Sequence, residues 1–422
     1  MTHTAQESPA TALPAGVRDD FPILTTLPGP YLDNAATAHK PRTVLDAITR
    51  YYTTANSNVG RGYHALGRRS TDVYEQARAD VQEALGAAQP EEVVFTAGTT
   101  DAVNTVADGL RHLLGPGKAV LVSGMEHNSN LLPWRRLAEE TGAQLRVAPV
   151  DARGRVDTEA FTALLGPEVP LVALSHVSNV LGTVNPVEQL VAAAHRHGAL
   201  VVVDGAQAVP HRAVDVRALD ADFYCFSAHK VYGPMGTGVL YGKRDLLDEL
   251  RPPRVGGGTV KGVHATEPVR YVPVPARLEA GTPNVAGAVG LAAALRYLDG
   301  LGRDAVRAHD EQLVRYAVHR LSERPDVRVI GAPEEDPSGI VSFVVDGVHP
   351  YDVGGQLDEQ GIAVRCGVHC ASTFLDDLGL LGTVRASFAV YNTRADVDTL
   401  VGALDAVRPD VWTNEHPTTR FL

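Results

Sequence analysis

Short apolar runs alternate with segments of helical periodicity from about residue 92 onward. The apolar runs include EEVVFTAG, AVLVSG, LVALSHVSN, LVVVDGAQA and GTGVLYG. A run such as LVVVD lacks the period-two alternation of a half-exposed strand, so both of its faces are expected to be buried. Parallel strands that helices cover on both sides have this pattern. The sequence therefore predicts an α/β fold built on a mainly parallel sheet.

Polar residues follow directly after several of these runs. In parallel α/β sheets, ligands bind outside the carboxyl ends of the strands, where such residues gather. The candidate site residues are therefore Thr99, Thr100, His127, Asn179, Asp204, Gln207, Ser227, His229 and Lys230.

The C-terminal part of the chain carries a second α/β pattern, and 422 residues are too many for one simple core. Residues 251–286 are rich in proline and glycine without a period, which predicts a long loop. Helices are expected at about 287–299 and 302–323, before the strand-like runs VRVIG, GIVSFVVDG, IAVRCG and VRASFAV. We expect a partly disordered N-terminal extension, a large domain and a small domain with a cysteine loop, at 1–30, 31–290 and 291–422.

Charge and missing motifs exclude several classes of protein. The formal net charge is −12, whereas a nucleic-acid surface needs positive charge. Neither G-x-x-x-x-G-K-[ST] nor G-x-G-x-x-G occurs, so ATP and dinucleotide sites lose their main support. No apolar run approaches the roughly 18–20 residues of a membrane span, and the N-terminus lacks an apolar signal core. We expect a cytoplasmic protein without nucleic-acid or membrane partners.

The three cysteines, Cys225, Cys366 and Cys370, are too few for a disulfide framework. The spacing of RCGVHC does not match a zinc knuckle, and no second Cys/His cluster completes four ligands, so no metal site is expected. The cysteines are therefore expected to act either as packing residues or as reactive thiols. Cys225, inside DFYCF, is expected in the core.

Lys230 is one of only five lysines against 33 arginines, and it lies between a strand and the glycine-rich turn of SAHKVYGPMGTG. Burial among small residues would favour a neutral, nucleophilic amine, although a surface lysine is the ordinary alternative. Asp204 at the end of LVVVD could hold a pyridinium nitrogen protonated, or merely cap a turn. AGTTDAVN opens a helix whose N–H groups suit a phosphate. Together the three features specify pyridoxal phosphate.

The chain resembles class V aminotransferase-fold enzymes, and within them the Suf-type (group II) cysteine desulfurases and selenocysteine lyases. The resemblance rests on ordered segments that span residues 31–393: YLDNAAT, GTTDAVN, EHNSNLLPW, NVLGTVNPV, VVDGAQAVPH, SAHKVYGPMGTGVLY, RLEAGTPN, VHPYDV, RCGVHC and RASFAVYNT. It implies a fold type I pyridoxal-phosphate-dependent transferase that forms a homodimer with shared active sites. L-Cysteine would be converted to L-alanine, and a sulfur-acceptor protein is a possible partner.

The resemblance also implies roles for individual residues. Lys230 would hold the cofactor covalently, His127 would stack on its ring, Asp204 would meet the ring nitrogen and Gln207 the phenolic oxygen. The phosphate would be bound by Thr99, Thr100, Ser227 and His229, and by Thr282 from the neighbouring subunit. The substrate would be bound by Asn34, Asn179 and Arg385.

Cys370 would attack the substrate sulfur and carry it as a persulfide, by the same resemblance. A thiol with its ordinary pKa near 8.5 is only about 3% thiolate at pH 7, so the site must lower that pKa or the substrate must take the proton. His369 is adjacent but would point away on a strand. Cys366 is expected to pack rather than act as a redox partner.

Three departures from the family pattern leave the substrate and the sulfur acceptor open. The cysteine motif reads V-H-C-A-S-T, and Gly60 precedes Arg61 where histidine is usual. Tyr351 replaces the second histidine of H-P-H-D, which has been linked to docking a zinc-containing acceptor. The alternatives are therefore a lyase for selenocysteine or an S-substituted cysteine, a class V transaminase or epimerase, and a non-catalytic scaffold or sulfur-relay subunit.

Overall fold

A seven-stranded, mainly parallel sheet forms the centre of the molecule. The computed structural model describes residues 12–60, 62–151, 153–262, 266 and 268–409. The strand order is β1 (Val93–Thr96), β7 (Gly238–Gly242), β6 (Phe223–Ser227), β5 (Leu200–Asp204), β4 (Leu171–Ser175), β2 (Ala119–Ser123) and β3 (Gln144–Ala148). Only β7 runs antiparallel to its neighbours, so the predicted α/β class is confirmed.

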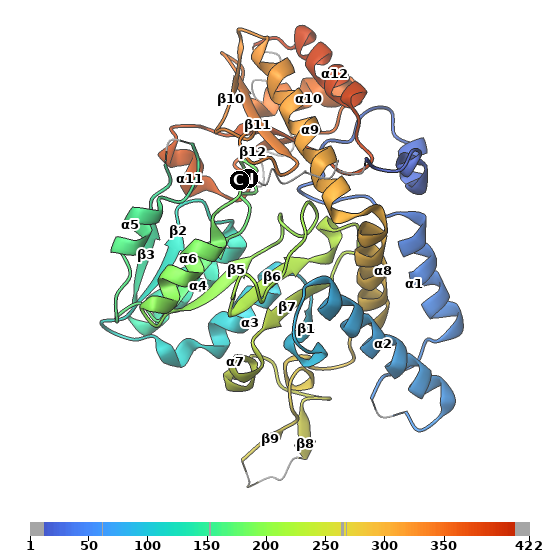
Figure 1. Ribbon diagram of the computed structural model, residues 1–422, viewed down its shortest axis with the longest axis vertical. Coiled ribbons are helices and arrows are strands. Elements are labelled where there is room, and N and C mark those ends of the chain that lie inside the picture. The colour runs from blue at the N-terminus through green and yellow to red at the C-terminus, as the bar shows by residue number, and fades with distance from the viewer. Residues whose placement is uncertain (1–11, 61, 152, 263–265, 267, 410–422) are drawn as a thin grey trace, which may run out of the picture.

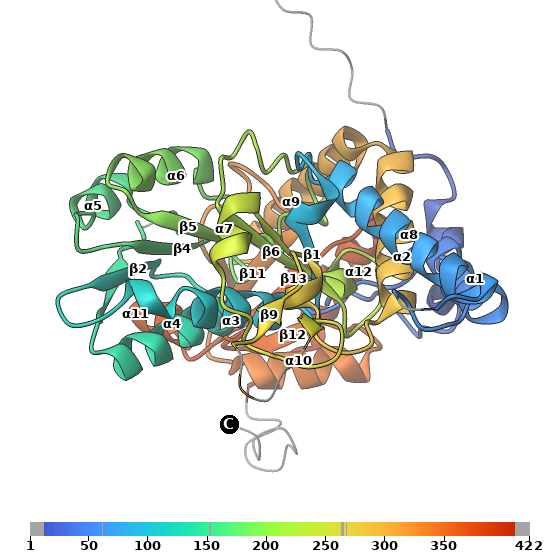
Figure 2. The same ribbon diagram turned by 90° about the horizontal axis from the view of Figure 1, so that it is seen from below.

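Helices cover both faces of this sheet, as Figure 2 shows with α5 and α6 on one side and α3 and α4 on the other. Alternate residues of one strand serve different cores, because side chains of a strand point to opposite faces. In β5, Val201 and Val203 belong to one apolar cluster and Val202 to another. This explains the unbroken apolar runs. The covering helices are α3 (Thr99–Gly109), α4 (Asn128–Thr141), α5 (Thr158–Ala163), α6 (Val187–Arg196) and α7 (Arg244–Glu249).

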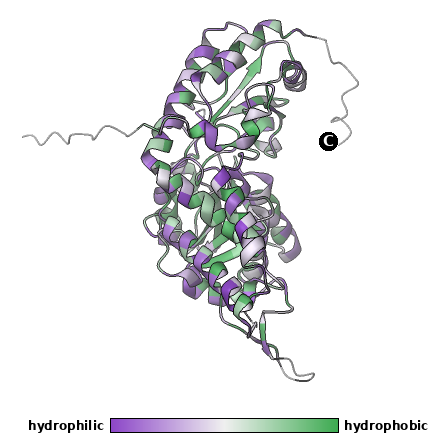
Figure 3. Cartoon of the chain, turned by 90° about the vertical axis from the view of Figure 1, so that its right-hand side faces the viewer, coloured by the Kyte–Doolittle hydropathy of each residue, from purple (hydrophilic) through white to green (hydrophobic). Residues whose placement is uncertain are grey.

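A smaller antiparallel sheet lies beside the carboxyl ends of the central strands (Figure 1). Its order is β10 (Val327–Val329), β11 (Ile340–Val345), β13 (Thr383–Ser387) and β12 (Arg365–Gly367). All three pairings are antiparallel, and the strands match the four runs predicted from sequence. The accompanying helices are α9 (Arg303–Ser322), α10 (Pro350–Glu359), α11 (Ser372–Asp377) and α12 (Arg394–Ala403). Figure 3 shows hydrophobic residues concentrated on the interior strands.

The sequence reasoning did not identify two N-terminal helices and the edge strand β3. The helices are α1 (Arg42–Thr54) and α2 (Ala65–Ala84), and both pack against α8 (Val285–Leu301). The buried face of α2 includes Ser70 and Arg78. Because small and polar side chains fill that face, its apolar periodicity is weak.

The long loop expected at 251–286 contains regular structure, which corrects that prediction. Strands β8 (Val260–Gly262) and β9 (Arg270–Tyr271) form a hairpin that projects from the body (Figure 1). Two strands alone leave little apolar surface to bury, so the periodic signal is small. The short 3₁₀ turns of the chain are η1 (Val17–Asp20), η2 (Pro22–Thr25), η3 (Pro90–Glu92), η4 (Arg111–Leu113), η5 (Ala228–Lys230), η6 (Ala276–Leu278) and η7 (Leu404–Ala406).

Among the described residues, no single helix is long and apolar enough to cross a bilayer. Helices α8 and α9 meet the length and composition criteria only when joined across a bend of 79°.

A buried aromatic side chain helps to attach the N-terminal segment to the core. Phe21 lies between η1 and η2, is fully buried and has its ring centroid 4.6 Å from that of Tyr391 and 5.9 Å from that of Tyr232. Part of the predicted N-terminal extension, residues 1–11, lies outside the described residues, so the disorder expected there stays a prediction. Arg61 also lies outside the described residues.

Replacing Phe21 with alanine should lower the free energy of unfolding by about 3–5 kcal/mol, because a large buried ring leaves a cavity. Urea denaturation followed by circular dichroism measures this loss. Ile23→Ala is the matched control: its side chain is 43% exposed, so a loss below about 1 kcal/mol is expected. Equal losses in the two variants would contradict the anchoring role.

Candidate active site

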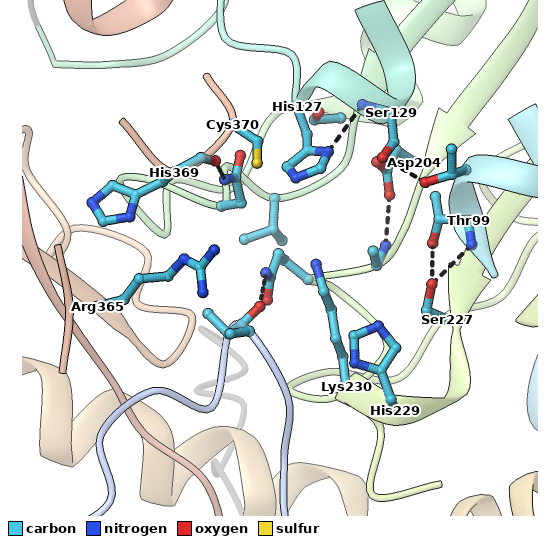
Figure 4. A pocket seen from close by; sticks show the side chains of 18 of the residues that line it. Thr99, His127, Ser129, Asp204, Ser227, His229, Lys230, Arg365, His369 and Cys370 are labelled. Carbon is cyan, nitrogen blue, oxygen red and sulfur yellow. Dashed lines mark hydrogen bonds between the residues drawn. The ribbon is translucent and has the colours of Figure 1, made fainter. Parts of the chain in front are cut away.

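A cavity of about 250 Å³ lies outside the carboxyl ends of β4, β5 and β6, where the two sheets face each other. This is the position expected for a ligand in a parallel α/β sheet. Figure 4 shows the side chains that converge on it from different elements. The structure brings together eleven of the predicted residues: Thr99, Thr100, His127, Asn179, Asp204, Gln207, Ser227, His229, Lys230, Cys370 and Arg385.

Lys230 reaches the cavity from η5, the turn that follows β6 directly. Backbone hydrogen bonds fix this turn: Ala228 N donates to Thr237 O at 2.9 Å and Val231 N to Ala228 O at 3.0 Å. Burial lowers the pKa of Lys230 to about 8; within this net shift Asp204 acts to raise the pKa, and Arg385 and Arg365 act to lower it. A neutral, nucleophilic amine is therefore accessible near neutral pH.

Asp204 ends β5 and presents a buried carboxyl group to the same cavity. Its Oδ1 accepts a hydrogen bond from Ala206 N at 2.9 Å, and burial raises its pKa. A buried carboxylate needs a cationic or donating partner, which a protonated ring nitrogen would supply. Gln207 donates through Nε2 to Ala35 O at 2.8 Å, while its buried Oε1 has no hydrogen-bond partner among the described residues.

Hydroxyl groups and the start of α3 form a cradle at one end of the cavity. Ser227 Oγ accepts from Thr99 N at 2.8 Å and lies 2.8 Å from Thr99 Oγ1. Thr100 Oγ1 and Ser129 Oγ are hydrogen-bonded at 2.7 Å. Gly98 precedes the helix, and a Cβ atom there would lie only 3.3 Å from Ser227 Oγ. N–H groups, hydroxyls and close backbone approach suit a phosphate.

His127 occupies the N-cap of α4 and accepts from Ser129 N through Nδ1 at 3.0 Å. Burial lowers its pKa to about 3, with Lys230 as the next cause. The imidazole is therefore neutral at pH 7 and can lie against an aromatic ring without adding charge. Lysine, carboxylate, cradle and neutral imidazole together fit pyridoxal phosphate.

Arg385 on β13 and Asn179 after β4 are linked at the opposite end of the cavity. Arg385 Nη1 donates to Asn179 O at 2.7 Å, and Asn179 Nδ2 donates to His369 O at 2.7 Å. Arg385 Nε is buried without a partner among the described residues. A fixed guanidinium with free N–H groups is suited to a carboxylate.

Cys370 lies in the loop between β12 and α11, and its sulfur faces the cavity on the His127 side (Figure 4). His369 and Cys370 have φ angles of 51° and 55°, which few side-chain-bearing residues adopt. Cys370 O accepts from Asn128 N at 2.8 Å. Residues held in such conformations by their surroundings often mark functional sites.

The imidazole of His369 points away from the Cys370 sulfur. Its Nε2 is 2.8 Å from Thr383 Oγ1, and burial lowers its pKa to about 2. It is thus neutral at pH 7 and directed at the small sheet. The two side chains point in different directions, as expected, although His369 and Cys370 lie in the turn after β12 rather than on a strand.

The other two cysteines are in apolar surroundings, and all three thiols are free. Burial raises the pKa of Cys366 to about 12 and that of Cys225 well above its ordinary value. Cys366 packs against Gly354, where a Cβ atom would come within 2.4 Å of its sulfur. Both thiols stay protonated at pH 7, which favours a packing role.

Two predicted residues do not line the cavity. Asn34 is engaged elsewhere: its Nδ2 donates to Ser387 O at 2.6 Å and to Asn392 Oδ1 at 3.0 Å. Thr282 lines a separate cavity beside Arg78. Their roles toward substrate and a neighbouring subunit's cofactor remain predictions.

Sequence reasoning missed Arg365, which lines the cavity, and Asp33, which pairs with it. Arg365 is directly opposite Arg385 in the register of β12 and β13. The position of Arg365 at the start of the RCGVHC motif could have marked it as a site residue. Asp33 gave none, because nothing local links YLDNAAT to residues more than 300 positions away.

The sequence pattern of the Aminotransferase class-V family matches residues 30–400. The chain belongs to this family. A "Cysteine desulfurase" from Haloferax volcanii is 46% identical, and the alignment covers 93% of this chain and 96% of that relative.

Solved structures titled as cysteine desulfurases and as C-DES share the fold. The apo cysteine desulfurase from Thermococcus onnurineus has a TM-score of 0.90 at 40% identity and covers 94% of this chain and 98% of its own. The cysteine desulfurase CsdA (S-sulfonic acid) from Escherichia coli has a TM-score of 0.88 at 41% identity, and the match covers 94% of this chain and 98% of that one. A less similar structure is that of C-DES, a lysine-to-alanine mutant with glycine covalently linked to the PLP cofactor. Its TM-score is 0.81 at 26% identity, and the match covers 93% of this chain and 99% of that one.

Covalent attachment of pyridoxal phosphate to the cofactor-free protein should speed up with pH and level off above about 8. The neutral amine is the nucleophile, and burial has moved the pKa of Lys230 down from 10.5. Stopped-flow recording of the visible absorbance after mixing measures the rate. Lys230→Ala should give no such absorbance. A rate that keeps rising up to pH 10.5 would contradict the lowered pKa.

Proposed function

We propose that this chain is a pyridoxal-phosphate-dependent cysteine desulfurase that converts L-cysteine to L-alanine and holds the sulfur as a persulfide on Cys370. The observation that carries the proposal is the presence of the Cys370 thiol in one cavity with Lys230 and Arg385. An amine that can hold the cofactor, a carboxylate anchor and a nucleophile are the groups that this reaction needs. Relatives named cysteine desulfurase at 46% identity support it.

Arg385 and Asn179 bind and orient the amino acid. The unpartnered Nε and the Nη2 of Arg385 offer N–H donors to the α-carboxylate, and Asn179 O fixes the guanidinium through Nη1. A charge-assisted hydrogen bond of this kind contributes about 1.5–3 kcal/mol. The side-chain sulfur of the bound amino acid is thereby directed toward Cys370.

The residues around the cofactor site control protons. The bound pyridoxal ring supplies an electron sink when its nitrogen is protonated. The Asp204 carboxylate would hold the proton on that nitrogen, and Gln207 lines the same cavity. Lys230 Nζ, with its lowered pKa, can accept the α-proton of the substrate and return a proton at the end of the reaction.

Cys370 takes the sulfur. Its thiolate attacks the substrate sulfur, so that a sulfur–sulfur bond forms while the carbon–sulfur bond breaks and its electron pair passes to the carbon. The substrate sulfur keeps its hydrogen as the terminal thiol of the persulfide, and one proton, equivalent to the one that Cys370 gave up, completes the methyl group of alanine. L-Cysteine and the Cys370 thiol thus give L-alanine and the Cys370 persulfide, with no added oxidant.

Cys370→Ser should lower L-alanine formation from L-cysteine by on the order of 100-fold or more, because the hydroxyl cannot accept sulfur. Amino-acid analysis and a sulfide assay in the presence of a thiol reductant measure the products. Cys366→Ala, which removes a thiol that stays protonated, is the matched control and should retain activity. Undiminished turnover in Cys370→Ser would overturn the proposal.

A carbon–sulfur lyase is the second candidate. A structure titled as the cystine C-S lyase C-DES with its product cysteine persulfide has a TM-score of 0.79 at 25% identity. A lyase for selenocysteine or an S-substituted cysteine would not need Cys370 as a sulfur acceptor. Turnover of such a substrate that survives Cys370→Ser, without alanine formation from cysteine, would favour it.

We also propose a homodimer in which each subunit completes the site of the other, and a protein that accepts the sulfur. Thr282 supports the first point, since it is exposed and lies outside the cavity of its own chain. Tyr351, at the start of α10, occupies the position that the family gives to a histidine linked to zinc-containing acceptors. An acceptor without zinc suits this chain better.

Thr282→Ala should weaken cofactor retention by roughly tenfold, as expected for the loss of one charge-assisted hydrogen bond to phosphate. Dialysis followed by absorbance measures retention, and analytical ultracentrifugation tests the dimer. Thr399→Ala is the control, because its exposed hydroxyl donates to Ala395 O within the same helix. Unchanged retention, or a monomer that holds the cofactor, would contradict the shared site.

A further inference from the structure

A buried carboxylate fixes one end of the loop that carries Thr282, residues 279–284. Glu279 lies three residues before Thr282, and its side chain is only 8% exposed. Its Oε1 accepts hydrogen bonds from Arg78 Nη1 and Phe95 N, both at 2.7 Å, and its Oε2 accepts from Arg78 Nη2 and Tyr74 OH, both at 2.9 Å. Two donors on each oxygen, with a bidentate arginine among them, hold the carboxylate in one orientation.

The donors belong to a helix and to an edge strand of the central sheet. Arg78 lies on the buried face of α2, and Phe95 is part of β1. The Arg78 guanidinium also donates to Val93 O at 2.8 Å and lies over the rings of Tyr74 and Phe95, 5.0 Å from each centroid. Removing one member of such a buried ion pair leaves the other charge uncompensated, so Glu279 is firmly attached to these two elements.

The cap of α8 fixes the other end of the loop. Asn284 accepts from Gly287 N through Oδ1 at 2.9 Å and donates through Nδ2 to Thr237 Oγ1 at 3.1 Å. Thr282 is exposed and lies between Glu279 and Asn284. Because both ends of this short segment are held, the Thr282 hydroxyl is presented in a narrow range of positions.

We propose that Glu279 and Arg78 are positioning residues for the active site of the neighbouring subunit: they hold the loop so that the Thr282 hydroxyl meets the cofactor phosphate bound there. This rests on the shared site proposed above and adds two residues to it. Neither residue lines the Lys230 cavity of its own chain, as far as the structure describes it. Loss of the ion pair should therefore weaken cofactor binding in the neighbouring subunit rather than in the subunit that carries the change.

Mixed dimers of two co-expressed, differently tagged chains test this, because Lys230→Ala limits covalent cofactor attachment to one chain. In the first arrangement, Glu279→Gln and Lys230→Ala are on the same chain and the other chain is unaltered. In the second, Glu279→Gln is on the chain that keeps Lys230, and the other chain carries only Lys230→Ala. After dialysis and borohydride reduction, mass spectrometry measures the fraction of Lys230-bearing chains that retain pyridoxal phosphate.

Retention should fall by about tenfold in the first arrangement, which is the loss expected for Thr282→Ala, and stay unchanged in the second. A loss only in the second arrangement would assign the ion pair to the site of its own subunit. Equal losses in both would assign it to general stability. Either result, or unchanged retention in both arrangements, would overturn the proposal.

Glu92→Gln is the matched control. It neutralises another buried carboxylate by the same isosteric change, and this carboxylate accepts from Ala88 N at 2.8 Å. Retention should stay unchanged in both arrangements. A loss equal to that of Glu279→Gln would assign the effect to the removal of any buried charge and reject the positioning role.

Thr282→Ala, measured in both arrangements, separates this inference from the shared site. If its loss follows the first arrangement and that of Glu279→Gln does not, the positioning role alone is rejected. If Thr282→Ala lacks this pattern, or if no dimer with both tags forms, the shared site and this inference fail together. Turnover is not measured, so a failure to form alanine from cysteine would reject the desulfurase proposal and leave this result separate.

Tyr74→Phe keeps the experiment decisive if Glu279→Gln does not fold. It removes one of the four donors to Glu279 and leaves the ion pair and the ring beside Arg78 in place. Retention should then fall several-fold in the first arrangement only, because the loop is held less firmly. Unchanged retention there, or any loss in the second arrangement, would contradict the positioning role.

Discussion

The burial of charge at the junction of two sheets is the constraint on which the site depends. Lys230 and Asp204 reach the cavity from adjacent parallel strands, and Arg385 comes from the smaller sheet. Each group would be costly to bury alone, so each needs an oppositely charged or hydrogen-bonding partner. The lowered pKa of Lys230 is the chemical result: the fold that encloses the amine also makes it reactive.

The site is also where the two sheets are joined. Asn179, from the large sheet, accepts from Arg385 and donates to His369 O, so one residue connects the carboxylate anchor to the cysteine loop. Binding of substrate and position of the nucleophile are therefore set by the same hydrogen bonds. This connection explains why an ordinary-looking turn residue belongs to the site.

The local sequence pattern predicted much of the fold and of the cofactor end of the site. An unbroken apolar run such as LVVVD indicates a buried strand, and the polar residue at the end of the run then lies at the carboxyl end of that strand. The pattern failed where burial uses polar side chains, as at Arg78 in α2, which pairs with Glu279. It also failed for Asp33 and Arg365, whose pairing arises only when β12 forms. The role of Asn34 toward substrate stays a prediction, and in this fold its amide donates to Ser387 O and Asn392 Oδ1.

The two consecutive left-handed residues before α11 have a consequence for how sulfur leaves the protein. His369 and Cys370 belong to a loop of the small sheet, but their carbonyl oxygens accept hydrogen bonds from Asn179 and Asn128 of the large one. Hydrogen bonds therefore fix the backbone at Cys370 and at the residue before it. A sulfur carried on Cys370 cannot move outward while these hydrogen bonds are intact. The sulfur-acceptor protein proposed above would therefore have to insert a slender extended segment into the opening or separate the two sheets locally. The rate of sulfur transfer would then depend on two hydrogen bonds to backbone carbonyls, one from the Asn179 side chain and one from Asn128 N, rather than on sulfur chemistry.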